Sequence, residues 1–146
     1  MNIELKIDEK CKDNKIIIQA NKMTKEIENV FELLKQVNES KFLVTLNEET
    51  FFITENDIES IYSMDKKVFI KTEDNTYQTK QRLYEFENIL PSNDFIRISN
   101  SEIVNLNKVK SINTRILGSI VITFFSGYKT YSSRRYIARI KEVLGI

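Results

Sequence analysis

From residue 41 onward, short β-prone segments alternate with polar turns, and this alternation constrains the fold more than any other feature of the chain. Each segment is short and rich in Val, Ile, Phe, Thr or Tyr, which is typical of strands in antiparallel sheets. The expected strands cover residues 42–46, 50–54, 58–63, 68–72, 77–80, 95–99, 109–112, 120–125 and 129–131. The sequence therefore predicts many short strands joined by tight turns.

Two short helices are expected among these strands. The first places Leu83 and Phe86 at helical spacing and ends before Pro91, because proline cannot continue a helix. The second covers residues 135–144 at the end of the chain, with Tyr136, Ile140 and Leu144 on one face. We therefore predict a mainly β domain, α+β overall, over residues 41–146.

Residues 1–40 predict a small β-β-α extension. Its strands are expected at residues 3–7 and 15–20, and Thr24 or Asn21 can cap the helix that follows. The apolar residues of this helix recur at spacings of three and four: Met23, Ile27, Val30, Phe31, Leu34 and Val37. A unit of this size cannot enclose a good core alone, so we expect it to pack on the rest of the chain or on a second copy.

Two absences from the composition restrict the chemistry. The chain has no histidine and one cysteine, Cys11. These counts exclude a histidine base, a Ser-His-Asp triad, a His-ligated metal and a multi-cysteine metal cluster. We expect no cofactor, no metal and no enzyme activity. No apolar run approaches 18 residues, and we expect a cytoplasmic protein.

The net charge of +1 conceals an uneven distribution of charged residues. Residues 1–40 carry −1, residues 41–94 carry −5, and residues 95–146 carry +7. A basic C-terminal third in a nearly neutral chain is what an anionic partner requires. The alternative is that these charges scatter over a solvated surface.

Three polar loops carry the candidate binding residues. Such loops often only satisfy their own backbone, but three of them on one β scaffold are typical of a surface that binds a polyanion. Arginine and lysine reach phosphates or guanine edges, and asparagine can pair with adenine. The candidates are Lys66, Lys67, Arg97, Asn100, Ser101, Ser133, Arg134 and Arg135.

The order and spacing of several motifs over the last 105 or so residues resemble the LytTR family of DNA-binding domains. The chain shows Ile61-Tyr62-Ser63 before a basic loop, Tyr77-x-Thr-Lys-x-x-Leu-x-x-Phe-Glu-x-x-Leu, Phe95-Ile-Arg-Ile-Ser-Asn-Ser-x-Ile-Val-Asn-Leu-x-x-Val-x-x-Ile, and Gly127 followed by Tyr131-x-Ser-Arg-Arg-Tyr. The resemblance implies three small antiparallel sheets with a short helix, and DNA reading by loops inserted into successive major grooves.

The resemblance also implies residue roles. It assigns base reading to Lys66, Asn100 and Arg135. Residues around them, mostly near phosphates, would be Arg97, Ser101, Ser133 and Arg134. Some family members have histidine where this chain has Lys66, and many have histidine where it has Ser99; a lysine can still reach guanine O6 and N7.

The expected partner is double-stranded DNA, and no small-molecule substrate is expected. Forty residues cannot supply the doubly wound receiver domain of a response regulator, so the chain resembles standalone LytTR regulators. In that family such regulators are often encoded beside a membrane protein that restrains them, and a homodimer is a further expectation. An alternative is a protein-interaction module that acts through residues 1–40 with little DNA binding.

Overall fold

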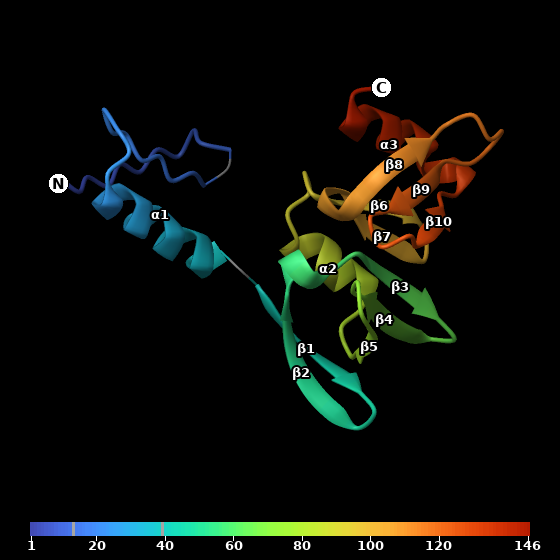
Figure 1. Cartoon of the computed structure of the whole chain (residues 1–146). Helices are drawn as coiled ribbons and strands as arrows, with labels where there is room; N and C mark the ends of the chain where they lie inside the picture. The colour runs from blue at the N-terminus through green and yellow to red at the C-terminus, as the bar shows by residue number, and fades with distance from the viewer. Residues whose placement is uncertain (13, 39) are drawn as a thin grey trace. The chain divides into compact units, whose positions relative to one another are not determined.

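A computed structural model describes residues 1–12, 14–38 and 40–146 of the chain. The chain divides into two compact units, Met1–Asn38 and Glu39–Ile146 (Figure 1). We call them the first and the second unit and describe each by itself. Within the described ranges, no helix is long and apolar enough to cross a membrane.

The first unit contains one α-helix, α1 (Lys25–Asn38). Thr24 caps it, since its Oγ1 accepts a hydrogen bond from the backbone N–H of Ile27 at 3.3 Å. Of the expected apolar face, Ile27 and Leu34 are half-buried, whereas Phe31 remains exposed. The side chain of Val37 lies outside the described part of the structure.

The two strands expected in the first unit are not formed. Residues 3–7 and 15–20 have no strand assignment, and Ile3, Leu5 and Ile7 are 94%, 84% and 83% exposed. Two strands alone are marginal in water, because they need a third strand or a packed helix to bury one face. Alternation of apolar residues was therefore insufficient to predict a sheet here.

The second unit is built from ten strands in two antiparallel sheets, which confirms the mainly β prediction. The seven-stranded sheet has the order β2-β1-β5-β4-β3-β7-β6, and the three-stranded sheet has the order β10-β9-β8. The strands are β1 (Lys41–Leu46), β2 (Glu49–Thr54), β3 (Ser60–Met64), β4 (Lys67–Lys71), β5 (Thr76–Thr79), β6 (Phe95–Ser99), β7 (Glu102–Asn105), β8 (Val109–Asn113), β9 (Val121–Phe124) and β10 (Lys129–Tyr131).

The described strands thus form two sheets, where the resemblance implied three. The larger sheet is continuous only because β1 and β5 share a single paired position, Thr45 opposite Gln78. On the other side of this weak junction, β1 pairs with β2 along six positions. The β1–β2 hairpin is therefore nearly a separate sheet.

Two hairpins of this sheet close with two-residue turns. Asn47 and Glu48 join β1 to β2 with φ of 50° and 68°, and Asp65 and Lys66 join β3 to β4 with φ of 52° and 65°. Positive φ at both central residues matches the right-handed twist of the flanking strands. The first turn is one residue shorter than the three expected, because Glu49 already belongs to β2.

Short helices complete the second unit: α2 (Leu83–Ile89), α3 (Ile137–Leu144) and the 3₁₀ turns η1 (Glu55–Asp57), η2 (Leu106–Lys108) and η3 (Arg134–Tyr136). The helix predicted over residues 135–144 therefore begins as a 3₁₀ turn and becomes α-helical at Ile137. Gly145 ends α3 at a φ of 71°, a conformation that favours glycine.

The second unit contains two hydrophobic cores. The first, which includes α2, consists of Phe42, Val44, Ile53, Ile58, Ile61, Val68, Ile70, Tyr77, Leu83, Phe86, Leu90, Phe95 and Ile103. The second, which includes α3, consists of Ile96, Ile98, Val104, Ile120, Ile122, Phe124 and Ile140. Strands β6 and β7 contribute to both cores, so each of them is buried on both faces. The loop between these two strands therefore projects from strands that are packed on both sides.

Candidate nucleic-acid interface

The loop between β6 and β7 presents Asn100 to solvent and is braced from within. The hydroxyl of Ser99 accepts a hydrogen bond from the N–H of Ser101 at 3.2 Å, and the two serine Oγ atoms lie 3.3 Å apart. Asn100 and Ser101 are exposed. The loop therefore combines a defined backbone with polar groups open to a ligand.

Arg97 braces the same loop from β6. Its Nε donates to the carbonyl of Ser99 at 2.8 Å, and its Nη2 donates to the carbonyl of Asn100. Its Nη1 forms an ion pair with Glu87 of α2, and only 20% of the Arg97 side chain is exposed. This guanidinium is engaged within the protein, so its predicted place near a phosphate stays a prediction without support from the geometry.

Hydrogen bonds join this loop to the start of the C-terminal helical segment. The hydroxyl of Tyr136 in η3 donates to Oδ1 of Asn100 at 2.9 Å. The N–H of Ser133 donates to the carbonyl of Ile98 in β6 at 2.9 Å. The structure thus brings the predicted residues Asn100 and Ser133 together, along with the arginine pair that follows Ser133.

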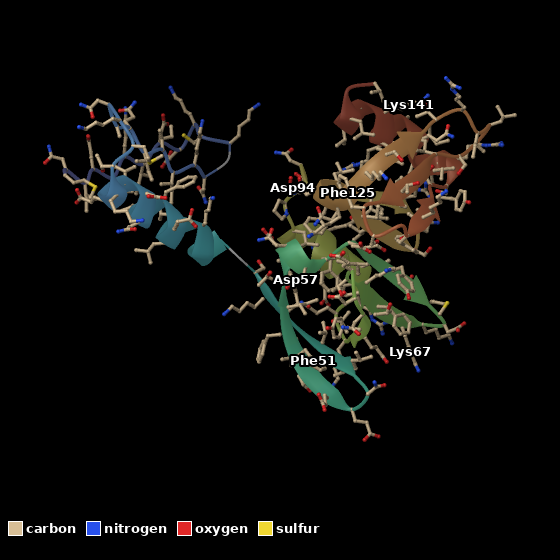
Figure 2. All side chains as sticks on the ribbon, viewed as in Figure 1. Phe51, Asp57, Lys67, Asp94, Phe125 and Lys141 are labelled. Carbon is tan, nitrogen blue, oxygen red and sulfur yellow. The ribbon has the colours of Figure 1, made fainter. Side chains whose placement is uncertain are left out.

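The β3–β4 turn lies beside the same loop. The N–H of Ser63 near the end of β3 donates to the carbonyl of Ser101 at 2.8 Å. Lys66 and Lys67 follow closely and are exposed, and Figure 2 shows Lys67 beside the β3–β4 turn. Nη1 of Arg82 donates to the carbonyl of Lys66 at 3.2 Å. Hydrogen bonds therefore join the 99–101 loop to the end of β3 on one side and to η3 on the other. We call the three predicted loops the reading loops: residues 65–67, 99–101 and 133–135.

The two consecutive arginines of η3 differ in their surroundings, although both are exposed. The guanidinium of Arg134 lies over Gly118 in the β8–β9 connection, where a Cβ added to the glycine would sit 2.7 Å from Nη2. Gly118 has a φ of 76°, which also favours glycine. Arg134 is thus positioned against the protein surface, whereas none of the three described glycines has Arg135 among its nearest atoms.

One of the two acidic residues of the C-terminal segment is buried between the two sheets. Residues 95–146 contain only two acidic residues, and Glu102 is 8% exposed. Its carboxylate accepts hydrogen bonds from Ser60 at 2.7 Å, from Tyr128 at 3.3 Å and from Thr130. These bonds form a polar bridge between the two sheets.

The pKa of Tyr128 in this bridge is raised to about 12, first by burial and then by the nearby Glu102 charge.

Sequence reasoning missed two residues that organise this surface. Tyr136 was interpreted only as part of an apolar helix face, and Arg82 lies 16 positions from the Lys66 carbonyl that it contacts. Spacing along the sequence reveals neither the contact of Tyr136 with Asn100 nor that of Arg82 with Lys66.

Within the described residues, no group of three or more Cys, Asp or Glu side chains is arranged to hold a metal ion.

Comparisons with known proteins identify the family of this chain. Residues 48–145 match the family model described as the LytTr DNA-binding domain. The chain therefore belongs to the LytTr DNA-binding domain family, which is not an enzyme family. A solved LytTr DNA-binding domain from Bacillus cereus superposes with a TM-score of 0.70 at 26% identity, covering 73% of this chain and 98% of that structure.

Curated relatives extend the similarity over the whole length. An uncharacterized HTH-type transcriptional regulator of Staphylococcus aureus strain MSSA476 is 34% identical over 147 residues, covering 100% of this chain and 99% of the relative. The corresponding protein of strain NCTC 8325 is 33% identical with the same coverage. The family and these relatives support a DNA-binding regulator.

Proposed function

We propose that this chain is a sequence-specific transcriptional regulator that reads the DNA major groove with loops. The observation that carries the proposal is the hydrogen bonding of the central reading loop to the strand before the 65–67 loop and to the 3₁₀ turn η3. Asn100 and Ser101 of the central loop are bonded to Tyr136 on one side and Ser63 on the other. Preorganised polar groups on several loops suit recognition of an extended, anionic surface.

Within this proposal the side chains divide into two roles. Lys66 and Arg135 contact guanine edges, and Asn100 contacts an adenine, because these pairings match the donors and acceptors of the major groove. Contacts to phosphates, which position the protein without reading sequence, come from Lys67, Ser101, Ser133 and Arg134. Arg97 supports the central loop, since its guanidinium already bonds two loop carbonyls.

The helical content favours loops as the reading elements. Along the described residues, strands separate α1, α2 and α3 from one another, so no two α-helices are consecutive. A helix-turn-helix motif needs two helices joined by a short turn. The name HTH-type belongs to the relatives. In this chain the basic residues Arg134 and Arg135 instead precede α3 in a 3₁₀ turn.

The first unit is proposed to contact another protein. It carries a hollow of about 620 Å³ whose lining includes Ile16, Ile18, Met23, Ile27 and Phe31. The partner is either a second copy of this chain, which gives a homodimer, or a membrane protein encoded nearby. Sedimentation of the full chain and of residues 39–146 tests the first: a reversible dimer should be lost with the first unit.

The exposed apolar residues of the first unit also favour a second candidate function, a protein-interaction module with little DNA binding. The salt dependence of duplex binding separates the two. Each neutralised phosphate contributes a slope of about −0.9 in log K against log salt, so six contacts give about −5. A slope near zero would favour the interaction module.

The arginine pair provides the residue-level test of base reading. Arg135→Ala should weaken the preferred duplex by about 1–3 kcal/mol more than a scrambled duplex, because a bidentate base contact is lost. Arg134→Ala should weaken both duplexes alike and reduce the salt slope by about one. Competition binding with the two duplexes measures this difference. Equal loss of specificity in both variants would contradict the assignment of the base contact to Arg135.

A further inference from the structure

Asn100 is exposed to solvent, yet hydrogen bonds hold both its backbone carbonyl and its side chain. It is exposed at the tip of the β6–β7 loop, yet its carbonyl accepts from Arg97 and its side-chain Oδ1 accepts from Tyr136 at 2.9 Å. Asparagines in turns commonly bond to their own neighbouring backbone. Here the side-chain partner lies 36 positions away in the sequence, on a different element.

The Tyr136 hydroxyl occupies one lone pair of the Asn100 amide oxygen. An asparagine amide has two N–H donors and one carbonyl oxygen with two lone pairs. This contact restrains the rotation of the Asn100 side chain. It leaves both N–H groups and one lone pair of Asn100 available. One donor beside one acceptor is the pattern that adenine N7 and N6–H₂ require.

The position of Tyr136 also connects two of the reading loops. Its backbone N–H donates to the carbonyl of Ser133 at 3.1 Å, and its ring packs against the second core. Arg135 is its immediate neighbour in η3. Because Ser133 is bonded in turn to Ile98 of β6, the hydroxyl contact closes a ring of interactions between η3 and the central loop.

We propose that Tyr136 is a positioning residue for DNA recognition: its hydroxyl presets the Asn100 amide for a bidentate contact with adenine and fixes Asn100 relative to Arg135. The proposal rests on the proposed function, since it requires Asn100 to read a base. Tyr136 itself acts through Asn100 and does not contact DNA. Ring packing supplies its structural role, so the hydroxyl can be removed without emptying the core.

The experiment begins with selection of preferred duplexes from a library with a randomised core, using the full chain. Base preferences are then compared for wild type, Tyr136→Phe, Asn100→Ala and the double variant. At one adenine position Asn100→Ala should lose roughly 5- to 150-fold of discrimination. Tyr136→Phe should lose about two- to tenfold at the same position, as expected for one hydrogen bond. Tyr84→Phe, on the exposed part of α2, is the matched control and should change nothing.

The double variant distinguishes positioning from general destabilisation. If the hydroxyl acts through Asn100, Tyr136→Phe should have no further effect in the Asn100→Ala background. Binding to scrambled duplex, the salt slope and the urea midpoint should match wild type in Tyr136→Phe. Additive losses in the double variant, or full discrimination by Tyr136→Phe, would overturn the proposal. Absence of any base preference in the wild type would instead overturn the proposed function.

Discussion

The two units of this chain use apolar residues in opposite ways. The second unit encloses them in two cores, with Phe86, Phe124 and Ile140 fully buried. In the first unit, no described side chain is buried, and Ile3 and Leu5 are more than 80% exposed. The first unit is about as apolar as the chain as a whole, so apolar content is not what separates the units. A segment of 38 residues has too little opposing surface to close a core, whereas two sheets and two helices provide it.

This difference determines where recognition residues can be held accurately. Strands β6 and β7 are packed between both cores, and they end at the loop that carries Asn100. Buried strands hold such a loop more precisely than a mobile segment would. The first unit offers no comparable support, although its exposed apolar surface suits a protein partner.

The contrast between the units predicts its largest effect on the free energy of unfolding for two phenylalanines, one in each unit. Phe86→Ala should lower the free energy of unfolding by about 3–5 kcal/mol, because the ring is fully buried and packs 5.3 Å from the Phe42 ring. Phe31→Ala, at a residue 44% exposed on α1, should cost less than about 1 kcal/mol. Urea unfolding followed by far-ultraviolet circular dichroism measures both. Similar losses would mean that the first unit has a closed core.

A second prediction concerns the polar bridge between the sheets of the second unit. Its Tyr128 has a pKa raised from 10.0 to about 12 by burial and by Glu102. The folded state therefore retains a proton that the unfolded state loses, so stability is fully present below pH 10 and is lost as pH rises towards 12. Two pKa units correspond to about 2.7 kcal/mol, and the partial exposure of Tyr128 to solvent makes this figure an upper limit for the loss.

The Tyr128→Phe variant isolates this effect from other groups that titrate at high pH. Its free energy of unfolding should fall less than that of wild type between pH 10 and 12, as measured by urea unfolding at each pH. All six tyrosines lie in the second unit, so their fluorescence reports on this unit alone. Parallel pH profiles for the two proteins would contradict the bridge as the cause.

Local pattern was sufficient to predict most strands of the second unit. The predictions at residues 95–99 and 129–131 coincide with β6 and β10, because alternation, turn residues and burial agree there. The same reasoning was wrong at residues 3–7 and 15–20. Alternation identifies a segment able to form a strand, but the fold decides whether a neighbouring strand and an opposing layer exist.

The residue types of the candidate site could be predicted from the sequence, but the contacts between these residues could not. Exposed Asn100 and Arg135 follow from residue type and turn position, whereas the environment of Arg97 does not. Its charge is paired with Glu87, ten positions earlier on another element. Likewise, the partner of Asn100 is Tyr136, which the helical pattern had assigned to packing alone. Contacts of this kind depend on topology, which spacing along one chain does not contain.

The smallest effect is expected from deleting residues 1–38. Both cores consist entirely of residues of the second unit, from Phe42 to Leu144 with the partly buried residues included. Residues 39–146 should therefore unfold cooperatively, with a tyrosine-detected free energy of unfolding within about 1 kcal/mol of the full chain. Residues 1–38 alone should unfold without a cooperative transition, since the isolated helix is short and its unit has no closed core. A fragment 39–146 without a cooperative transition would show that the first unit completes the fold of the second, and the contrast between the two units would then be lost.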